Sequence, residues 1–147
     1  MNKYDKIKLD NQICFPLYAL SREVIKLYKP ILEKHNLTYT QYVTMLVIWE
    51  KEKIDFKALG QKLHLDSGTL TPVVNKLVSM GLIFKYRNEA DDRLVTIEIT
   101  DKGKLLKEDI LDVPDQIFCN FEGDIEDAKM LKKYLDKFLN LTKDQQS

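Results

Sequence analysis

The sequence predicts a mainly α-helical chain with a small β wing, and three observations support this prediction. Long segments at both ends carry apolar residues at steps of three and four, the spacing of one helical face. Two shorter helical segments in the middle are joined by a tight turn. A glycine and two short apolar runs separated by a polar stretch follow directly, which is the pattern of a hairpin.

Length and composition are those of one ordinary domain covering residues 1–147. A hydrophobic content of 44% is enough for a packed core and argues against intrinsic disorder. No apolar run approaches the roughly 18 residues of a membrane span. The charged segment Met1–Asp10 is not followed by the apolar stretch of a signal peptide. We therefore expect a soluble, cytoplasmic protein with no membrane association.

The first helix is expected from an apolar stripe that runs from Leu9 through Ile13 to Ile31. Proline is tolerated in a first helical turn and costs roughly 3 kcal/mol in a helix interior. Pro16 therefore predicts either a helix that begins near Phe15 or a kink at that point. Pro30 is a second irregularity, close to the end of the stripe.

A turn at His35 and Asn36 leads into a second helix, Gln41–Glu50, with Thr40 as its expected cap. The inward-facing residues of this helix are expected to be Tyr42, Met45, Leu46 and Trp49.

A short third helix is expected to open at Ile54 and Asp55 and to stop near His64. The turn Leu65–Gly68 offers two good N-caps, and a fourth helix follows from about Thr69. We expect this fourth helix to bury Leu70, Val73, Val74 and Leu77.

Gly81 is a C-cap glycine, after which 82–84 and 94–99 read as two strands with 88–92 as the hairpin tip. Thr100 and Asp101 then cap a fifth helix, which Pro114 bends or interrupts. A final helix is expected at about 125–141.

This order of elements is typical of a winged helix-turn-helix at about residues 51–100. The flanking helices, at about 1–50 and 101–147, carry wide apolar stripes without a partner sheet. The simplest partner for those stripes is a second copy of the chain, so we expect a homodimer.

The start of the fourth helix is rich in small donors and acceptors, as a base-reading helix requires, because its N-terminal side chains meet base edges. Proline is acceptable there because it falls in the first turn. The alternative interpretation is a solvated helix start with ordinary caps. The candidate DNA-binding residues of this segment are Ser67, Gly68, Thr69, Thr71, Pro72, Asn75 and Lys76.

The predicted wing carries Arg87 and Arg93, and arginine on a wing can enter a narrow minor groove. Asp91 is placed to orient the Arg93 guanidinium or to brace the turn. The alternative is a solvated hairpin with a surface ion pair. Net charge does not support DNA binding, because residues 55–100 hold six basic and six acidic side chains and the whole chain is neutral.

Four separated motifs resemble one family. The run Asp91–Thr100 resembles the wing signature of MarR-type regulators, and 65–77 resembles the recognition helix of one branch of that family. The segments 11–15 (Asn-Gln-Ile-Cys-Phe) and 37–42 (Leu-Thr-Tyr-Thr-Gln-Tyr) are similar to the same branch. That branch is the organic hydroperoxide resistance regulators, with related staphylococcal thiol-based regulators. The resemblance covers nearly the whole chain.

Cys14 is expected near the start of the first helix, where backbone amides favour the reactive thiolate. Taken alone, a lone cysteine in an apolar segment is more often a packing residue. The resemblance implies that organic hydroperoxides oxidise Cys14 to a sulfenic acid. It also implies that Tyr28 and Tyr39 hydrogen-bond this sulfur across the dimer and that Tyr18 lies nearby. Pro16 departs from the family, which more often has a small helix former there.

Cys119 follows Pro114 as a resolving cysteine does in some relatives, which implies a Cys14–Cys119 disulfide after oxidation. The alternative is a packing residue between Phe118 and Phe121. The two histidines form no cluster at ligand spacing, so we expect no metal or other cofactor, and no catalytic motif is apparent.

The leading hypothesis is a homodimeric repressor that binds a pseudo-palindromic double-stranded DNA operator and is switched by organic hydroperoxide at Cys14. A second hypothesis replaces the peroxide with an aromatic ligand in the dimer pocket. A third is a thiol peroxidase or reductase that uses Cys14 and Cys119. The missing C-x-x-C motif and βαβ frame weigh against this third hypothesis.

Overall fold

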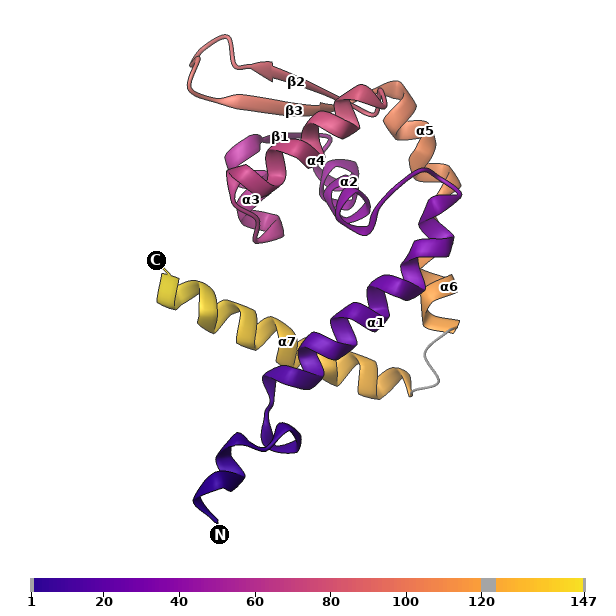
Figure 1. Cartoon of the computed structure of the whole chain (residues 1–147). Helices are drawn as coiled ribbons and strands as arrows, with labels where there is room; N and C mark the ends of the chain where they lie inside the picture. Colours follow the sequence, from indigo (N-terminus) through magenta and orange to yellow (C-terminus); the bar gives the residue numbers. More distant parts are fainter. Residues whose placement is uncertain (1, 120–123, 147) are drawn as a thin grey trace. The chain divides into compact units, whose positions relative to one another are not determined.

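The computed structural model describes residues 2–119 and 124–146 (Figure 1). The chain divides after Pro114 into two compact units, which are described separately below. None of the helices formed by the described residues is long and apolar enough to cross a bilayer.

Two short 3₁₀ turns, η1 (Lys3–Ile7) and η2 (Leu9–Asn11), precede the first α-helix, α1 (Cys14–Glu33). The start of α1 agrees with the expected helix start near Phe15. Pro16 is its third residue, where a missing N–H has no intrahelical partner to lose. Leu9 and Ile13 lie before α1, so the expected helical stripe was too long at its N-terminal end.

Helix α2 (Tyr39–Lys51) begins two residues earlier than a Thr40 cap would place it. Its cap is Thr38, whose hydroxyl accepts a hydrogen bond from the Gln41 backbone N–H at 3.2 Å. The Gln41 side chain accepts from the Thr38 N–H at 3.0 Å, completing a capping box. The Thr40 prediction was therefore wrong. The glutamine three residues after Thr38 decides between the two threonines.

Helix α2 forms the centre of the core, because Tyr42, Met45 and Trp49 are all buried as expected. Leu46 was also expected to face inward, but 43% of it is exposed in this chain. It lies on the side of α2 that borders a hollow described below.

Residues 53–55 form a strand, β1 (Lys53–Asp55), that the sequence reading placed at the start of the third helix. Helix α3 (Phe56–Leu63) begins only after it. The strand pairs with β3 (Val95–Ile99), with Ile54 opposite Ile97. Three residues are too few to show the alternation of a strand, so the sequence carries no local signal for β1. The strand forms because it pairs with β3, which lies far along the chain.

Helix α4 (Ser67–Ser79) begins two residues before the expected start at Thr69. Asp66 is the cap, and its carboxylate accepts from the Thr69 backbone N–H at 2.8 Å. The helix ends at Ser79, and Gly81 just after its cap has a φ of 76°, a left-handed conformation that glycine adopts without strain.

Strand β2 (Ile83–Arg87) is longer than expected and pairs antiparallel with β3. The sheet order is β1-β3-β2, and the hairpin of β2 and β3 projects from the rest of the unit (Figure 1). The predicted β wing is therefore confirmed, with a third strand added.

Helix α5 (Asp101–Asp109) is capped by Thr100, as expected. It packs closely on the core at Gly103, whose carbonyl accepts from the Trp49 indole N–H at 2.9 Å. A Cβ at position 103 would lie 2.4 Å from the Leu82 carbonyl oxygen, so only glycine fits this contact.

Pro114 falls in the first turn of α6 (Val113–Cys119), so the expected interruption after α5 is present. In the second unit α7 (Ile125–Gln146) extends beyond the expected end at Leu141. Several large apolar side chains of α7 are exposed in this single chain, among them Met130, Leu131, Tyr134, Phe138 and Leu139.

Candidate functional site

The outward stripe of α4 holds the residues expected to meet DNA. The opposite face of the helix buries Leu70, Val74 and Leu77 completely, which fixes the orientation of the helix. Every predicted DNA-contacting residue of α4 is exposed, except Thr71, which is half-buried. Those on the face opposite the core are Gly68, Thr71, Pro72 and Asn75, while Ser67, Thr69 and Lys76 flank them.

The first turn of α4 is ordered by two local hydrogen bonds. Besides the Asp66 cap on Thr69, the Thr71 hydroxyl donates to the Ser67 carbonyl at 2.6 Å. The backbone amide of Thr69 holds the pKa of the Asp66 carboxyl below its usual range. The helix start is therefore preformed, with one of its amides already engaged by a carboxylate.

Lys85 lies beside this stripe and was not singled out from the sequence. Its ammonium donates to Asn75 Oδ1 at 3.2 Å and lies 5.7 Å from the centre of the Phe56 ring. The alternation of side chains along β2 could have pointed to Lys85, because it lies on the same face of the strand as the predicted DNA contact Arg87.

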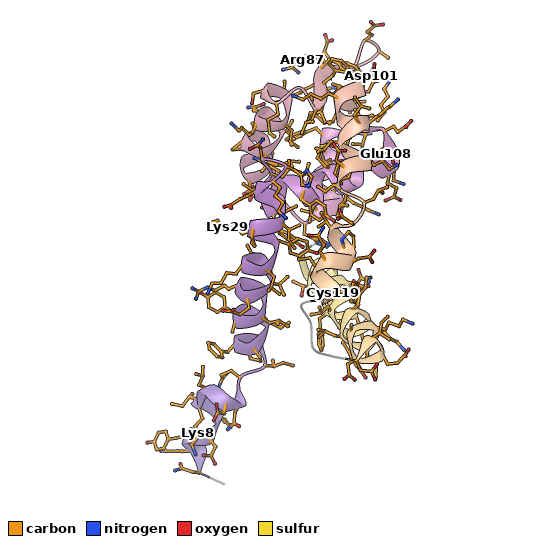
Figure 2. All side chains as sticks on the ribbon, turned by 90° about the vertical axis from the view of Figure 1, so that its right-hand side faces the viewer. Lys8, Lys29, Arg87, Asp101, Glu108 and Cys119 are labelled. Atoms are coloured by element: carbon orange, nitrogen blue, oxygen red, sulfur yellow. The ribbon has the colours of Figure 1, made fainter. Side chains whose placement is uncertain are left out.

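The wing tip holds both predicted arginines in defined positions. The Asp91 carboxylate accepts from the Arg93 backbone N–H at 3.0 Å and from its Nε at 3.1 Å, so it braces the turn and orients the guanidinium. These contacts lower the pKa of Asp91. The Arg93 side chain is 90% exposed. Arg87 donates to the Asp92 carbonyl at 2.8 Å and lies at the opposite end of this unit from Lys8 (Figure 2).

Cys14 is the first residue of α1, and its side chain is exposed. The residue before it, Ile13, makes no side-chain cap, and the first turn contains no acidic residue. Cys14 therefore lies at the end of α1 where backbone N–H groups lack intrahelical partners, and the first turn adds no anion there.

Three tyrosines cluster where α1 packs on α2. The Tyr28 and Tyr39 ring centres are 4.8 Å apart, and those of Tyr28 and Tyr42 are 5.7 Å apart. Burial raises the pKa of Tyr28 to about 12, and electrostatic interaction with Tyr39 and Tyr42 contributes to this rise. Burial also raises the pKa of Tyr39. These phenols therefore keep their protons at neutral pH and can act as hydrogen-bond donors.

Cys14 and Tyr28 cannot meet within one chain, because they lie near opposite ends of the same helix. Fourteen residues of α-helix at 1.5 Å each separate them by about 21 Å. Tyr18 is one turn from Cys14 and exposed, and the Arg22 guanidinium lies 5.6 Å from its ring centre. Of the three predicted partner tyrosines, only Tyr18 is near the sulfur of its own chain.

Helix α1 leaves most of its apolar side uncovered. Of its residues only Ile31 and Leu32, near its C-terminal end, are buried. In Figure 2 the part of the chain between Lys29 and Lys8 extends away from the winged region of this unit. The exposed large apolar residues of α1 include Phe15, Leu17, Tyr18, Leu20 and Ile25.

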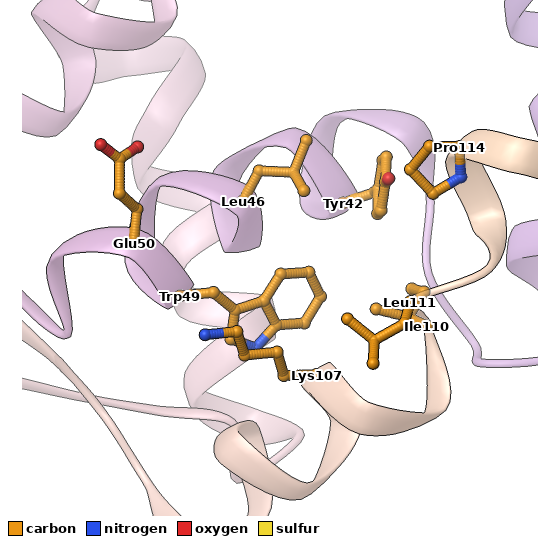
Figure 3. A pocket seen from close by; sticks show the side chains of 8 residues that line it. All are labelled: Tyr42, Leu46, Trp49, Glu50, Lys107, Ile110, Leu111 and Pro114. Atoms are coloured by element: carbon orange, nitrogen blue, oxygen red, sulfur yellow. The ribbon is translucent and has the colours of Figure 1, made fainter.

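A hollow of about 300 Å³ lies between α2 and the end of α5 (Figure 3). Its wall is largely apolar, and Lys107 and Glu50 are the charged residues that line it. It is of a size to hold one small aromatic ring system. The remaining lining residues are Tyr42, Leu46, Trp49, Ile110, Leu111 and Pro114.

Cys119 is the last residue of α6, and it is exposed. It belongs to the second unit, so a Cys14–Cys119 disulfide stays a prediction. Its neighbour Phe118 is 54% exposed, and Phe121 lies outside the described residues. Within residues 2–119 and 124–146, no three side chains of His, Cys, Asp or Glu gather as a metal site requires.

Comparison with known proteins identifies the family. A family model described as "Transcriptional regulator SarA/Rot" matches residues 26–110. The organic hydroperoxide resistance transcriptional regulator of Bacillus subtilis is 48% identical over 134 residues, which is 91% of each chain. The chain belongs to the MarR-type regulators, in the organic hydroperoxide regulator branch. The resemblance seen in the sequence is thereby confirmed.

The winged fold of this MarR-type regulator also matches solved structures. Reduced AbfR bound to DNA superposes with a TM-score of 0.83 at 27% identity, covering 99% of this chain and all of that one. A disulfide-formed AbfR structure has a TM-score of 0.65 at 29% identity, covering 93% and 96%. The predicted fold class, mainly helical with a β wing, is confirmed.

Proposed function

We propose that this chain is a homodimeric DNA-binding repressor whose affinity for its operator is switched by oxidation of Cys14 by organic hydroperoxides. The observation that carries the proposal is the position of Cys14 as the first residue of α1. The name of the Bacillus subtilis relative points to the same signal. Because a repressor acts where the DNA is, we also propose a cytoplasmic location.

The dimer follows from the exposed side of α1. If two copies of α1 pack antiparallel about a point near Ser21, Cys14 of one chain lies opposite Tyr28 of the other. The tyrosine cluster of the partner then supplies the donors that the sulfur lacks in its own chain. The same packing would cover Leu17 and Leu20, which are exposed in one chain.

The proposed chemistry is a two-electron oxidation of the Cys14 thiolate. The sulfur attacks the terminal oxygen of the hydroperoxide, an S–O bond forms, and the O–O bond breaks. The cysteine becomes a sulfenic acid, and the peroxide leaves as an alkoxide that takes a proton and becomes the alcohol. Tyr28 and Tyr39, protonated because their pKa values are raised, would hold the thiolate by donating hydrogen bonds.

The DNA-binding end would use α4 in the major groove and Arg93 in the adjacent minor groove. In a two-fold dimer the two α4 helices meet half-sites roughly 34 Å apart or a multiple of that, so the operator would be pseudo-palindromic. Oxidation at the dimer interface would change the spacing of the two winged regions and weaken binding.

Cys119 is the proposed resolving thiol. Its thiol would attack the Cys14 sulfenic acid, form the disulfide and release water. AbfR, a structural relative, has been solved in a disulfide form. The competing outcome is a mixed disulfide with a small thiol. Mass spectrometry of peroxide-treated protein separates the disulfide, the adduct and the unresolved sulfenic acid.

A mobility-shift experiment with reduced protein tests the switch, using a duplex selected for binding. Treatment with about one equivalent of cumene hydroperoxide per chain should release the DNA from the wild type but not from Cys14→Ser. Continued binding after mass spectrometry has confirmed oxidation of Cys14 would refute the proposal. Repeated consumption of peroxide in the presence of a reductant would instead indicate a thiol peroxidase.

A second candidate input is an aromatic ligand, and the hollow between α2 and α5 favours it. The Lys107 ammonium at its edge would suit an aromatic carboxylate. If this input operates, salicylate should release DNA from Cys14→Ser but not from Cys14→Ser carrying Leu111→Trp, which fills the hollow.

A further inference from the structure

The Asn75 amide on the exposed stripe of α4 has a defined hydrogen-bond partner in this structure. Its Oδ1 accepts a hydrogen bond from the Lys85 ammonium at 3.2 Å. Lys85 therefore engages the oxygen of the amide and not its NH₂ group. Lys85 itself is held from a second side, since its ammonium lies 5.7 Å from the centre of the Phe56 ring. Residues from α3, α4 and β2 therefore fix this one amide.

The orientation of an asparagine amide decides which base it recognises. A free asparagine pairs with adenine by accepting from N6–H₂ and donating to N7. Guanine presents two acceptors, N7 and O6, at the same edge. An amide whose oxygen already binds an ammonium offers donors, and the ammonium carries two further N–H groups of its own. A donor-rich pair of this kind matches guanine and repels the amino group of adenine.

We propose that Lys85 is a positioning residue that sets the base specificity of Asn75. By holding Asn75 Oδ1 it turns the amide nitrogen toward the DNA, and the pair reads guanine instead of adenine at one position of each half-site. This inference rests on the proposed function, because it requires α4 to lie in the major groove.

Selection from a random-sequence duplex library tests the inference with full-length, reduced protein. The variants are Asn75→Ala, Lys85→Met, Lys85→Arg and the double variant Asn75→Ala/Lys85→Met. Methionine keeps an unbranched, flexible stem beside Phe56 and removes the ammonium. Lys57→Met on α3 is the matched control, since it loses the same charge from an exposed lysine.

Asn75→Ala should lose its base preference at one symmetric position, which identifies the base that Asn75 reads. The wild type should prefer guanine over adenine there by about 5-fold or more, the lower end for a good side-chain–base pair. Lys85→Met should reverse the preference to adenine, and Lys85→Arg should keep guanine. In the double variant neither base should be preferred, and Lys57→Met should leave the preference unchanged.

The failures are distinguishable. If Asn75→Ala abolishes a preference that Lys85→Met leaves unchanged, or if Lys85→Met weakens binding to all sequences equally, Lys85 is at most a phosphate contact and the inference is wrong. If Asn75→Ala changes no position, Asn75 reads no base and the inference alone is wrong. If the wild type selects no common sequence, the placement of α4 in the proposed function is wrong as well.

Discussion

The winged region and helix α1 bury their apolar residues to very different extents. Between Tyr39 and Thr100, the helices and strands close on one another around fully buried residues such as Met45, Leu59 and Leu70. Helix α1 is longer than any of these elements, yet it buries only Ile31 and Leu32. The core of the winged region is therefore complete within one chain, whereas α1 leaves an apolar side that the proposed dimer would cover.

The largest expected effect follows from placing a charge on the uncovered side of α1. We expect Leu17→Glu to convert the dimer to a monomer, with a loss of at least about 100-fold in dimer affinity, because an unpaired buried charge costs several kcal/mol. The winged region should stay folded. Sedimentation equilibrium measures the dimer and circular dichroism the fold.

The control for this variant is Glu23→Lys, a charge change at an exposed polar position of the same helix. It should leave the dimer intact. A Leu17→Glu protein that remains fully dimeric would show that α1 does not form the dimer interface.

The winged region should instead be sensitive to its internal packing. Gly103→Ala would place a Cβ 2.4 Å from the Leu82 carbonyl and 2.8 Å from Ile99 Cγ1. We expect the free energy of unfolding to fall by about 3 kcal/mol, the upper end for overpacking, since the backbone has to move. Urea unfolding measures this change.

Gly68→Ala is the matched control, because the nearest atom to its added Cβ is Asp66 Oδ1 at 3.5 Å. Alanine is the better helix former, so this variant should be unchanged or slightly more stable. Equal effects at positions 68 and 103 would contradict the packing described for α5.

We expect the wing to make a smaller, separable contribution to DNA binding. We expect Arg93→Ala to weaken operator binding by about 10-fold and to reduce the slope of log affinity against log salt by about 1 for each chain of the proposed dimer. Asp91→Asn should give part of this loss, because it weakens the ion pair that orients Arg93. Fluorescence anisotropy at several salt concentrations measures both. Unchanged affinity and slope for Arg93→Ala would show that Arg93 of the wing does not contact the operator.

The smallest effect concerns the tyrosine cluster at high pH. The folded state holds the Tyr28 proton up to about pH 12, whereas the unfolded chain loses it near 10. The free energy of unfolding should therefore fall as the pH rises between these values, and Tyr28 should stabilise the fold fully only below pH 10. Tyr28→Phe should flatten this fall in urea titrations, while Tyr4→Phe, at an exposed tyrosine, should not.

Local signals were sufficient to predict an N-cap within 65–68, the cap at Thr100 and the glycine turn at 81, because each depends on a few consecutive residues. Thr38 was missed since two threonines compete there and only Gln41 distinguishes them. Strand β1 and the Lys85–Asn75 contact depend on segments distant in sequence, which periodicity does not connect. The roles of Tyr28 and Tyr39 came from family resemblance alone, because their spacing reads as an ordinary helix face.

The central proposal is that the peroxide site is assembled from two chains, and mixed dimers test it most directly. Combine a Cys14→Ser chain with a chain carrying Tyr28→Phe and Tyr39→Phe, and measure the rate at which cumene hydroperoxide oxidises Cys14. A shared site predicts one fully active site per mixed dimer, built from the intact cysteine and the intact tyrosines, with the wild-type rate. If Cys14 in the mixed dimer reacts as slowly as in the double tyrosine homodimer, the tyrosines act within their own chain and the proposal is wrong.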